Sequence, residues 1–315
     1  MTTPRARSTI ADQSTVFETI PNVSEGQRPD VLAAIETAVR RVPGLLLLDH
    51  SADPSHNRAV FTMAGTDEAV FQALMRLFEV AVARIDLRTH RGVHPRIGAV
   101  DVVPIVPLGD TTLDECRVLA DRVAHAVADR FGVPVFFYEA SSSHAWRARL
   151  EQIRKGQFEG LLDKLRLPEW TPDLGPAAPH PSAGATVVGA RRPLIAFNIN
   201  LASGNVAVAR EVAKAVRESS GGLACVKALG LALAHRGLAQ VSMNLTDYTR
   251  TSVQTVFDTV QREAQARGET VLESELIGLI PEAALAGTSG ERLKLTGFST
   301  SQILEVRIAE RLREV

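Results

Sequence analysis

The segment HPRIGAVDV, residues 94–102, places a histidine, an arginine and an aspartate directly before a run of apolar residues. Pro95 disfavours helical geometry for the residue before it, so we expect His94 to project from the start of an extended strand. A histidine titrates near neutral pH and can both accept and return a proton. His94 is therefore a candidate general acid/base, and the alternative is a hydrogen-bonded histidine in a surface turn.

Other charged residues accompany this histidine. Residues two apart in an extended strand share a face, which predicts that Arg96 points the same way as His94. Arg96 could then hold a substrate carboxylate in a bidentate pair, and Asp101 could orient the imidazole or a ligand amine. Asp49 directly follows four leucines and is expected to emerge where the sheet ends. For all three the alternative is a local ion pair or ordinary turn chemistry.

His90 and His94 have the spacing of two metal ligands on one helix face. Gly92 and Pro95 argue against a helix there, and the sequence contains no obvious third ligand. The chain also lacks the GxSxG, GxGxxG and GxxxxGK[ST] motifs. We therefore predict no metal site, no nucleophile elbow and no phosphate-binding loop.

Polar residues also interrupt apolar strands elsewhere in the chain. If alternate side chains faced an open groove, they could hydrogen-bond a heterocyclic ligand, and the alternative is buried, satisfied amides. The candidate substrate contacts of this kind are Asn22, Asn57, Arg191, Asn198 and Asn244.

Apolar periodicity and turn residues predict the order β-α-β-β-α-β twice, and a helix over 112–132 and a strand over 133–140 extend the first of these units. The expected strands are 16–23, 44–51, 58–65, 97–108 and 133–140, then 186–201, 222–233, 238–249 and 270–280. The expected helices are 29–42, 66–87 and 112–132, then 205–219 and 252–268. This α+β order is that of two ferredoxin-like subdomains whose facing antiparallel sheets enclose a ligand groove.

Segment 168–185 is rich in proline and glycine, which suits a linker or a binding loop. We expect a mobile tail over 1–14, an N-terminal subdomain over 15–183 and a C-terminal subdomain over 184–315.

Composition favours small-molecule partners. A formal net charge of -1 gives no bulk attraction to nucleic acid or to anionic membranes. The two cysteines form no CxxC pair, and the sequence contains no signal-like or spanning apolar segment. We expect a cytoplasmic protein with no nucleic-acid or membrane partner.

Nine short motifs together resemble the formiminotransferase family, over about residues 16 to 285. They are IPNVSEG, DPSHNRAVFTMAG, HPRIGAVDVVPIVPL, IRKGQFEGL, WTPDLGP, VGARRPLIAFNINL, VKALGLAL, QVSMNLTDY and SELIGLIP. The resemblance implies transfer of the formimino group from N-formimino-L-glutamate to the position-five nitrogen of tetrahydrofolate, which releases glutamate in histidine breakdown. Tetrahydrofolate would be a co-substrate, and a homodimer is expected.

The resemblance also implies roles for particular residues. His94 matches the catalytic histidine of the family, and the two carboxylates of the donor call for arginines, for which Arg96 and Arg191 are the candidates. Asp49 or Asp101 could set the tautomer of the imidazole. The implied folate-binding loop consists of Gly175, Pro176, Ala177, Ala178, Pro179, His180, Pro181, Ser182, Ala183 and Gly184.

Two alternatives remain at this level. One is a related folate-dependent transfer of a formyl group, or of a formimino group from another donor. The other is a folate-binding protein without turnover. The cyclodeaminase domain that is fused to the animal proteins is not expected in this chain.

Overall fold

The computed structural model describes residues 15–234 and 236–314. They form two compact units, the first ending at Arg191 and the second running from Arg192 to Glu314. The tail expected over 1–14 lies outside the described residues. Within the described ranges, no helix is both long enough and apolar enough to cross a membrane.

The first unit contains a seven-stranded sheet. Its strands are β1 (Val16–Thr19), β2 (Asn22–Val23), β3 (Leu46–Asp53), β4 (Arg58–Gly65), β5 (Val100–Leu108), β6 (Val135–Phe137) and β7 (Thr186–Ala190). Its helices are α1 (Pro29–Arg40), α2 (Asp67–Arg84), α3 (Leu113–Phe131), α4 (Leu150–Arg154) and α5 (Leu161–Leu165). From one edge the order is β3, β4, β1 with β2, β5, β7 and β6.

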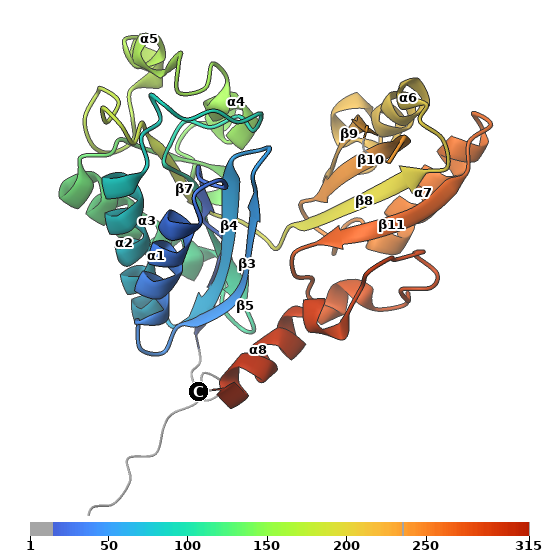
Figure 1. Ribbon diagram of the computed structural model, residues 1–315, viewed down its shortest axis with the longest axis horizontal. Helices are drawn as coiled ribbons and strands as arrows, with labels where there is room; N and C mark the ends of the chain where they lie inside the picture. The colour runs from blue at the N-terminus through green and yellow to red at the C-terminus, as the bar shows by residue number, and fades with distance from the viewer. Residues whose placement is uncertain (1–14, 235, 315) are drawn as a thin grey trace, which may run out of the picture. The chain divides into compact units, whose positions relative to one another are not determined.

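The three long helices of this unit have residues at their ends that favour helix starts and stops. Pro29 occupies the first turn of α1, and Thr66 caps α2 with its hydroxyl. Thr112 and Glu115 form a reciprocal capping box at α3, which ends at Gly132 in the left-handed conformation. These helices gather on one side of the sheet (Figure 1), where their apolar faces bury the main core.

The first sheet is mixed, so the expectation of a purely antiparallel sheet was wrong. β5 pairs with β7, and β7 with β6, in parallel, whereas every other pairing is antiparallel. Parallel pairing needs a crossover connection, which α3 supplies between β5 and β6. The sheet is thereby extended beyond the four-strand pattern.

The face away from the long helices is also not wholly free. Over β5, β6 and β7 it carries a second small core, in which Val102, Phe136 and Val187 join Ile153 of α4 and Leu161 of α5. The residues after β6 therefore fold back over half of the face that was expected to be open.

The other half of that face, over β3 and β4, is polar. Ala59, Phe61 and Met63 of β4 belong to the helix-side core, so the alternate residues Arg58 and Thr62 point to the opposite face. Asp49 pairs with Thr62, Asp53 with Arg58, and Asn22 with Val60. Asp49, Arg58 and Asn22 thus share one side of the sheet.

The second unit is a four-stranded antiparallel sheet with the order β11, β8, β10, β9. Its elements are β8 (Ile195–Leu201), α6 (Val206–Val216), β9 (Val226–Leu233), β10 (Leu238–Leu245), α7 (Val253–Gln265), β11 (Val271–Ile277) and α8 (Leu304–Glu314). The helices α6 and α7 bury one face of the sheet. The register aligns polar side chains on the other face, where Asn198 stands between Ser242 and Glu275.

The strand expected over 186–201 is two strands in two different sheets. β7 pairs with β5, and the Arg191 amide still donates to the Ile105 carbonyl oxygen (3.0 Å). β8 instead pairs with β10 and β11. The units consequently divide between residues 191 and 192, whereas the sequence places the division between 183 and 184.

Candidate active site

His94 lies in an irregular segment between α2 and β5. The Val93 amide donates to the Ser55 carbonyl oxygen (3.3 Å), and the Ala99 amide donates to the Ala183 carbonyl oxygen (2.9 Å). The β5 strand begins only at Val100, so the expectation that His94 and Arg96 share one face of an extended strand was wrong. Backbone contacts to two other loops, rather than a strand, set the orientation of the histidine.

The His94 imidazole is partly buried among charged groups. Burial, then the cations Arg58 and Arg154 and the ring of His56, lower its pKa to about 3, against a smaller opposing effect of Asp53. The imidazole is therefore neutral at pH 7. Its Nε2 atom is buried and makes no hydrogen bond among the described residues. At pH 7 the imidazole of His94 can therefore accept a proton.

Arg58 is the first of the two cations. Its Nε and Nη2 atoms both donate to Oδ1 of Asn22, the former at 2.8 Å, and the Asn22 amide donates to the Ile20 carbonyl oxygen at 3.0 Å. Burial lowers the pKa of Arg58 to about 10, so the side chain stays charged at neutral pH. Asn22 thereby orients Arg58 toward the region of His94.

Asp101 and Arg154 form the second charged group. Asp101 is buried, and its Oδ1 accepts from the Ile97 amide at 2.6 Å while its Oδ2 accepts from Arg154 Nε at 2.8 Å. The Asp101 carboxylate therefore fixes the turn that follows His94 and holds the Arg154 guanidinium. Both functions bear on the imidazole indirectly, through the backbone and through charge.

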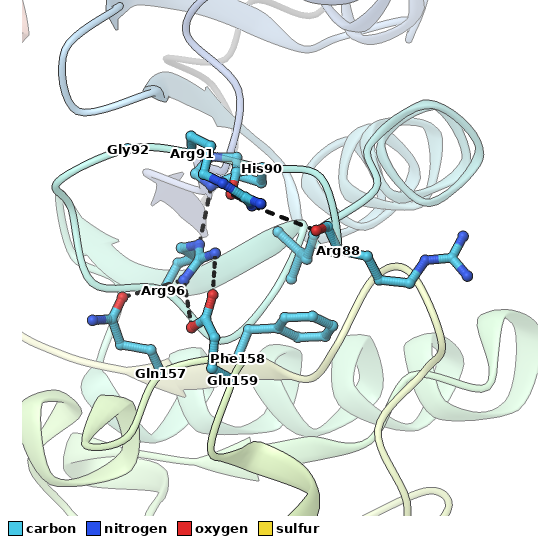
Figure 2. A pocket seen from close by; sticks show the side chains of 9 residues that line it. Arg88, His90, Arg91, Gly92, Arg96, Gln157, Phe158 and Glu159 are labelled. Atoms are coloured by element: carbon cyan, nitrogen blue, oxygen red, sulfur yellow. Dashed lines mark hydrogen bonds and ion pairs between the residues drawn. The ribbon is translucent and has the colours of Figure 1, made fainter.

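Arg96 is committed to a different set of contacts (Figure 2). Its guanidinium is buried and pairs with both carboxylate oxygens of Glu159, at 2.8 and 2.9 Å. Its Nε donates to Nδ1 of His90 at 3.0 Å. These groups line an open pocket of about 450 Å³, to which His94 does not contribute. A protein carboxylate therefore already occupies the position that a substrate carboxylate would take on Arg96.

Asn57 uses both ends of its amide within the protein. Its Oδ1 accepts from the Gly26 amide and its Nδ2 donates to the Arg91 carbonyl oxygen, each at 2.8 Å. Its backbone oxygen accepts from His90 Nε2 at 2.9 Å. Asn57 thus joins three loops around the site, and its φ of 50° suits an asparagine in a tight turn.

The remaining candidates lie elsewhere. Asp49 is partly exposed on the polar side of β3 and shares that side with Arg58. Arg191 directly follows β7, and its side chain hydrogen-bonds Tyr138. Asn198 donates to Glu275 at 3.1 Å in the second unit, and Asn244 is exposed on the same sheet.

The loop over residues 175–184 is anchored at one end and exposed at the other. His180 and Gly184 exchange backbone hydrogen bonds of 2.8 and 2.9 Å, and the Ser182 carbonyl oxygen accepts from the Leu87 amide. Gly184 has a φ of +71°, and a Cβ there would lie 2.1 Å from the Ile97 carbonyl oxygen. Residues 175–178 are exposed. The anchored half therefore packs against the segment that carries His94.

Comparison with known proteins assigns the family. The model for the N-terminal subdomain of the formiminotransferase domain matches residues 16–191, and the formiminotransferase domain model matches residues 196–294. The chain belongs to the formiminotransferase family.

Three relatives illustrate the similarity. A glutamate formimidoyltransferase of Streptococcus pyogenes serotype M1 is 43% identical over 291 residues, which are 92% of this chain and 97% of the relative. One from Thermoplasma acidophilum is 38% identical over 92% of this chain and 96% of the relative. The formimidoyltransferase-cyclodeaminase of Sus scrofa is 42% identical over 86% of this chain, but this spans only 51% of the pig protein.

Sequence reasoning did not assign roles to the two cations around the histidine of this formiminotransferase. Arg154 belongs to the IRKGQFEGL motif, which carried the resemblance but suggested no role for any one residue. Arg58 directly follows a polar turn, where turn chemistry explains most residues. Its place as the first residue of the apolar strand β4 was a signal that could have found it.

Proposed function

We propose that this chain is a glutamate formimidoyltransferase. It moves the formimino group from N-formimino-L-glutamate to the position-five nitrogen of tetrahydrofolate and releases L-glutamate, a step of histidine degradation. The observation that carries the proposal is the 43% identity to the Streptococcus pyogenes enzyme of that name over nearly the full length of both chains. The neutral His94, with a buried and unpartnered Nε2 among the described residues, supplies the chemistry.

His94 acts as general acid/base in this proposal. The folate nitrogen attacks the amidine carbon, and the resulting tetrahedral species breaks down as the glutamate nitrogen leaves. One nitrogen must lose a proton and the other must gain one. A neutral imidazole can accept the first proton and return it to the leaving nitrogen, and such catalysis contributes about two to four orders of magnitude to a rate.

Substrate binding would strengthen His94 as a base. A base works best when its pKa is near the working pH, and a pKa of about 3 lies well below that. A carboxylate of the donor bound beside Arg58 would offset the positive charge that acts on the imidazole and raise its pKa. We therefore propose Arg58, rather than the already paired Arg96, as the main carboxylate contact.

The loop over 175–184 would hold tetrahydrofolate, since its anchored half packs against the His94 segment and its other half is exposed. Asp101 would position the turn that follows the histidine. Asp49 would contact substrate on the polar side of β3, and Arg191, Asn198 and Asn244 stay candidate contacts.

Several architectural expectations also belong to the proposal. The strand order β11, β8, β10, β9 supports a ferredoxin-like second unit. Four positions of the first sheet have the equivalent order β5, β1 with β2, β4 and β3. The groove between the two sheets, the homodimer and the cytoplasmic location stay predictions.

A donor competition tests the proposal against its alternatives. Purified protein with tetrahydrofolate receives equal N-formimino-L-glutamate and N-formyl-L-glutamate, and the folate products are separated by chromatography. The proposal predicts the formimino adduct with one glutamate released per adduct. Formyl transfer alone would favour the related one-carbon reaction, and folate binding without consumption of either donor would favour the non-catalytic protein.

A further inference from the structure

Lys164 of α5 makes a set of contacts that the proposed chemistry does not use. Its ammonium group donates to the carbonyl oxygens of Gln152, Ile153 and Lys155, at 3.2, 2.7 and 3.0 Å. The same Nζ atom lies 3.5 Å from the centre of the Trp170 ring. All three ammonium donors are thus used, and the aromatic face stabilises the cation from the remaining side.

Two of these carbonyls belong to the last turn of α4, and the third, of Lys155, directly follows the helix. Of the three, the Gln152 carbonyl also accepts from the Lys155 amide, at 3.4 Å. The last carbonyls of a helix have no partner within it, and a cation at that end offsets their partial negative charge. The helix α4 has only five residues, and Gly156 and Gln157 beyond it both have positive φ. A segment so short has little stability of its own, so its shape depends on outside contacts such as Lys164.

The segment held in this way carries Arg154. In the sequence Arg154 stands between Ile153 and Lys155, whose carbonyl oxygens Lys164 binds, and its guanidinium pairs with Asp101. Its charge is one of those that act on His94, together with Arg58, His56 and Asp53.

We propose that Lys164 is a positioning residue for the histidine site, which fixes the end of α4 so that Arg154 stays paired with Asp101 beside His94. Lys164 contacts none of the proposed reacting groups, and it acts on the position of Arg154 through the backbone of α4. Burial and the neighbouring Lys155 lower the pKa of Lys164 to about 8, so the ammonium form still predominates at pH 7. This inference rests on the proposed role of His94, whereas its test does not need turnover.

The test follows the titration of His94 by NMR in Lys164→Met, with the resonance assigned by its loss in His94→Gln. We expect the pKa of His94 to rise from about 3 toward the ordinary value of 6.5, because Arg154 is released from the site. Lys155→Met is the matched control, since it removes an exposed lysine beside the same turn but leaves the backbone carbonyls bound. It should leave the titration of His94 nearly unchanged.

A double variant separates positioning from general loss of structure. In the Arg154→Gln background, Lys164→Met should cause no further shift of the His94 pKa. In the native background, Lys164→Arg keeps a cation at this position and should therefore shift the His94 pKa less than Lys164→Met does. In turnover, Lys164→Met should lower kcat by up to about 100-fold, as expected for small misplacements, with a smaller change in KM.

Two outcomes would overturn the inference. One is a His94 titration in Lys164→Met that matches the native protein, and the other is an equal additional shift in the Arg154→Gln background. Lys164→Gln, which keeps an amide donor, replaces the methionine variant if near-ultraviolet circular dichroism shows that the latter does not fold. A shift in the same direction is then expected, and its absence counts against the inference. If Lys164→Met shifts the His94 pKa as expected but the native protein shows no turnover, the inference stands and the proposed function is refuted instead.

Discussion

Replacing Arg58 with glutamine tests how charge sets the state of His94. The pKa of His94 is about 3, whereas that of an ordinary histidine is 6.5. This difference means that the protein disfavours the charged imidazole by roughly 5 kcal/mol. Burial is the largest cause, and Arg58 is the first of the charges. We therefore expect Arg58→Gln to raise the pKa of His94 in the free enzyme, as measured by NMR, with each recovered unit worth about 1.4 kcal/mol.

The same substitution should weaken donor binding. A hydrogen bond to a charged group contributes about 1.5–3 kcal/mol, so loss of the guanidinium should raise KM for N-formimino-L-glutamate by about 10- to 100-fold. KM for tetrahydrofolate should change much less. Arg117→Gln is the control, because Arg117 pairs with Asp114 on the exposed side of α3. An unchanged His94 titration together with an unchanged donor KM in Arg58→Gln would refute the reasoning.

Three further predictions concern stability and folate binding. Between pH 6.5 and about 3, His94 is protonated in the unfolded chain but not in the native state, so the free energy of unfolding decreases as the pH is lowered through this range. At pH 5, urea denaturation should show that His94→Gln avoids about 2 kcal/mol of this loss. Arg96→Gln breaks the pair with Glu159 and should lower the free energy of unfolding by about 1.5–3 kcal/mol, with a smaller rise in donor KM than Arg58→Gln causes. Gly184→Ala forces a Cβ against the Ile97 carbonyl at a φ of +71°, and it should cost about 1–3 kcal/mol and weaken tetrahydrofolate binding in calorimetry.

Each of these three has an outcome that contradicts it. Parallel stability curves of the native protein and His94→Gln across the acid range would show that the buried imidazole titrates normally. Full stability of Arg96→Gln would mean that the Glu159 pair contributes nothing. Unchanged folate affinity in a folded Gly184→Ala protein would separate the loop from folate binding.

Local patterns in the sequence were enough to find most elements of the fold. The apolar spacing of α1 and α2 and the pattern of β4 are properties of neighbouring residues, and the observed elements follow them closely. Long-range pairing was beyond such patterns. A strand such as β7, buried on both faces, gives the same apolar run whether it belongs to the first sheet or continues into β8.

The contacts of the candidate site could not be predicted from the sequence. His94 stays a candidate that its motif suggested, and the expected direction of Arg96 depended on a strand that begins only four residues later, at Val100. Asp101 and Arg154 are 53 residues apart, and their pairing follows from the way the chain folds back after β6. No periodicity within either segment encodes a contact over that distance.

The most direct test of the account is single-turnover transfer by the native protein and by His94→Gln, with N-formimino-L-glutamate and tetrahydrofolate at saturating concentrations. The account predicts equal amounts of glutamate and folate adduct from the native protein, and a rate about 100- to 10,000-fold lower in the variant with folate binding retained. A variant that transfers the formimino group at the native rate would contradict it, because the reaction would then proceed without the histidine on which the proposed chemistry depends.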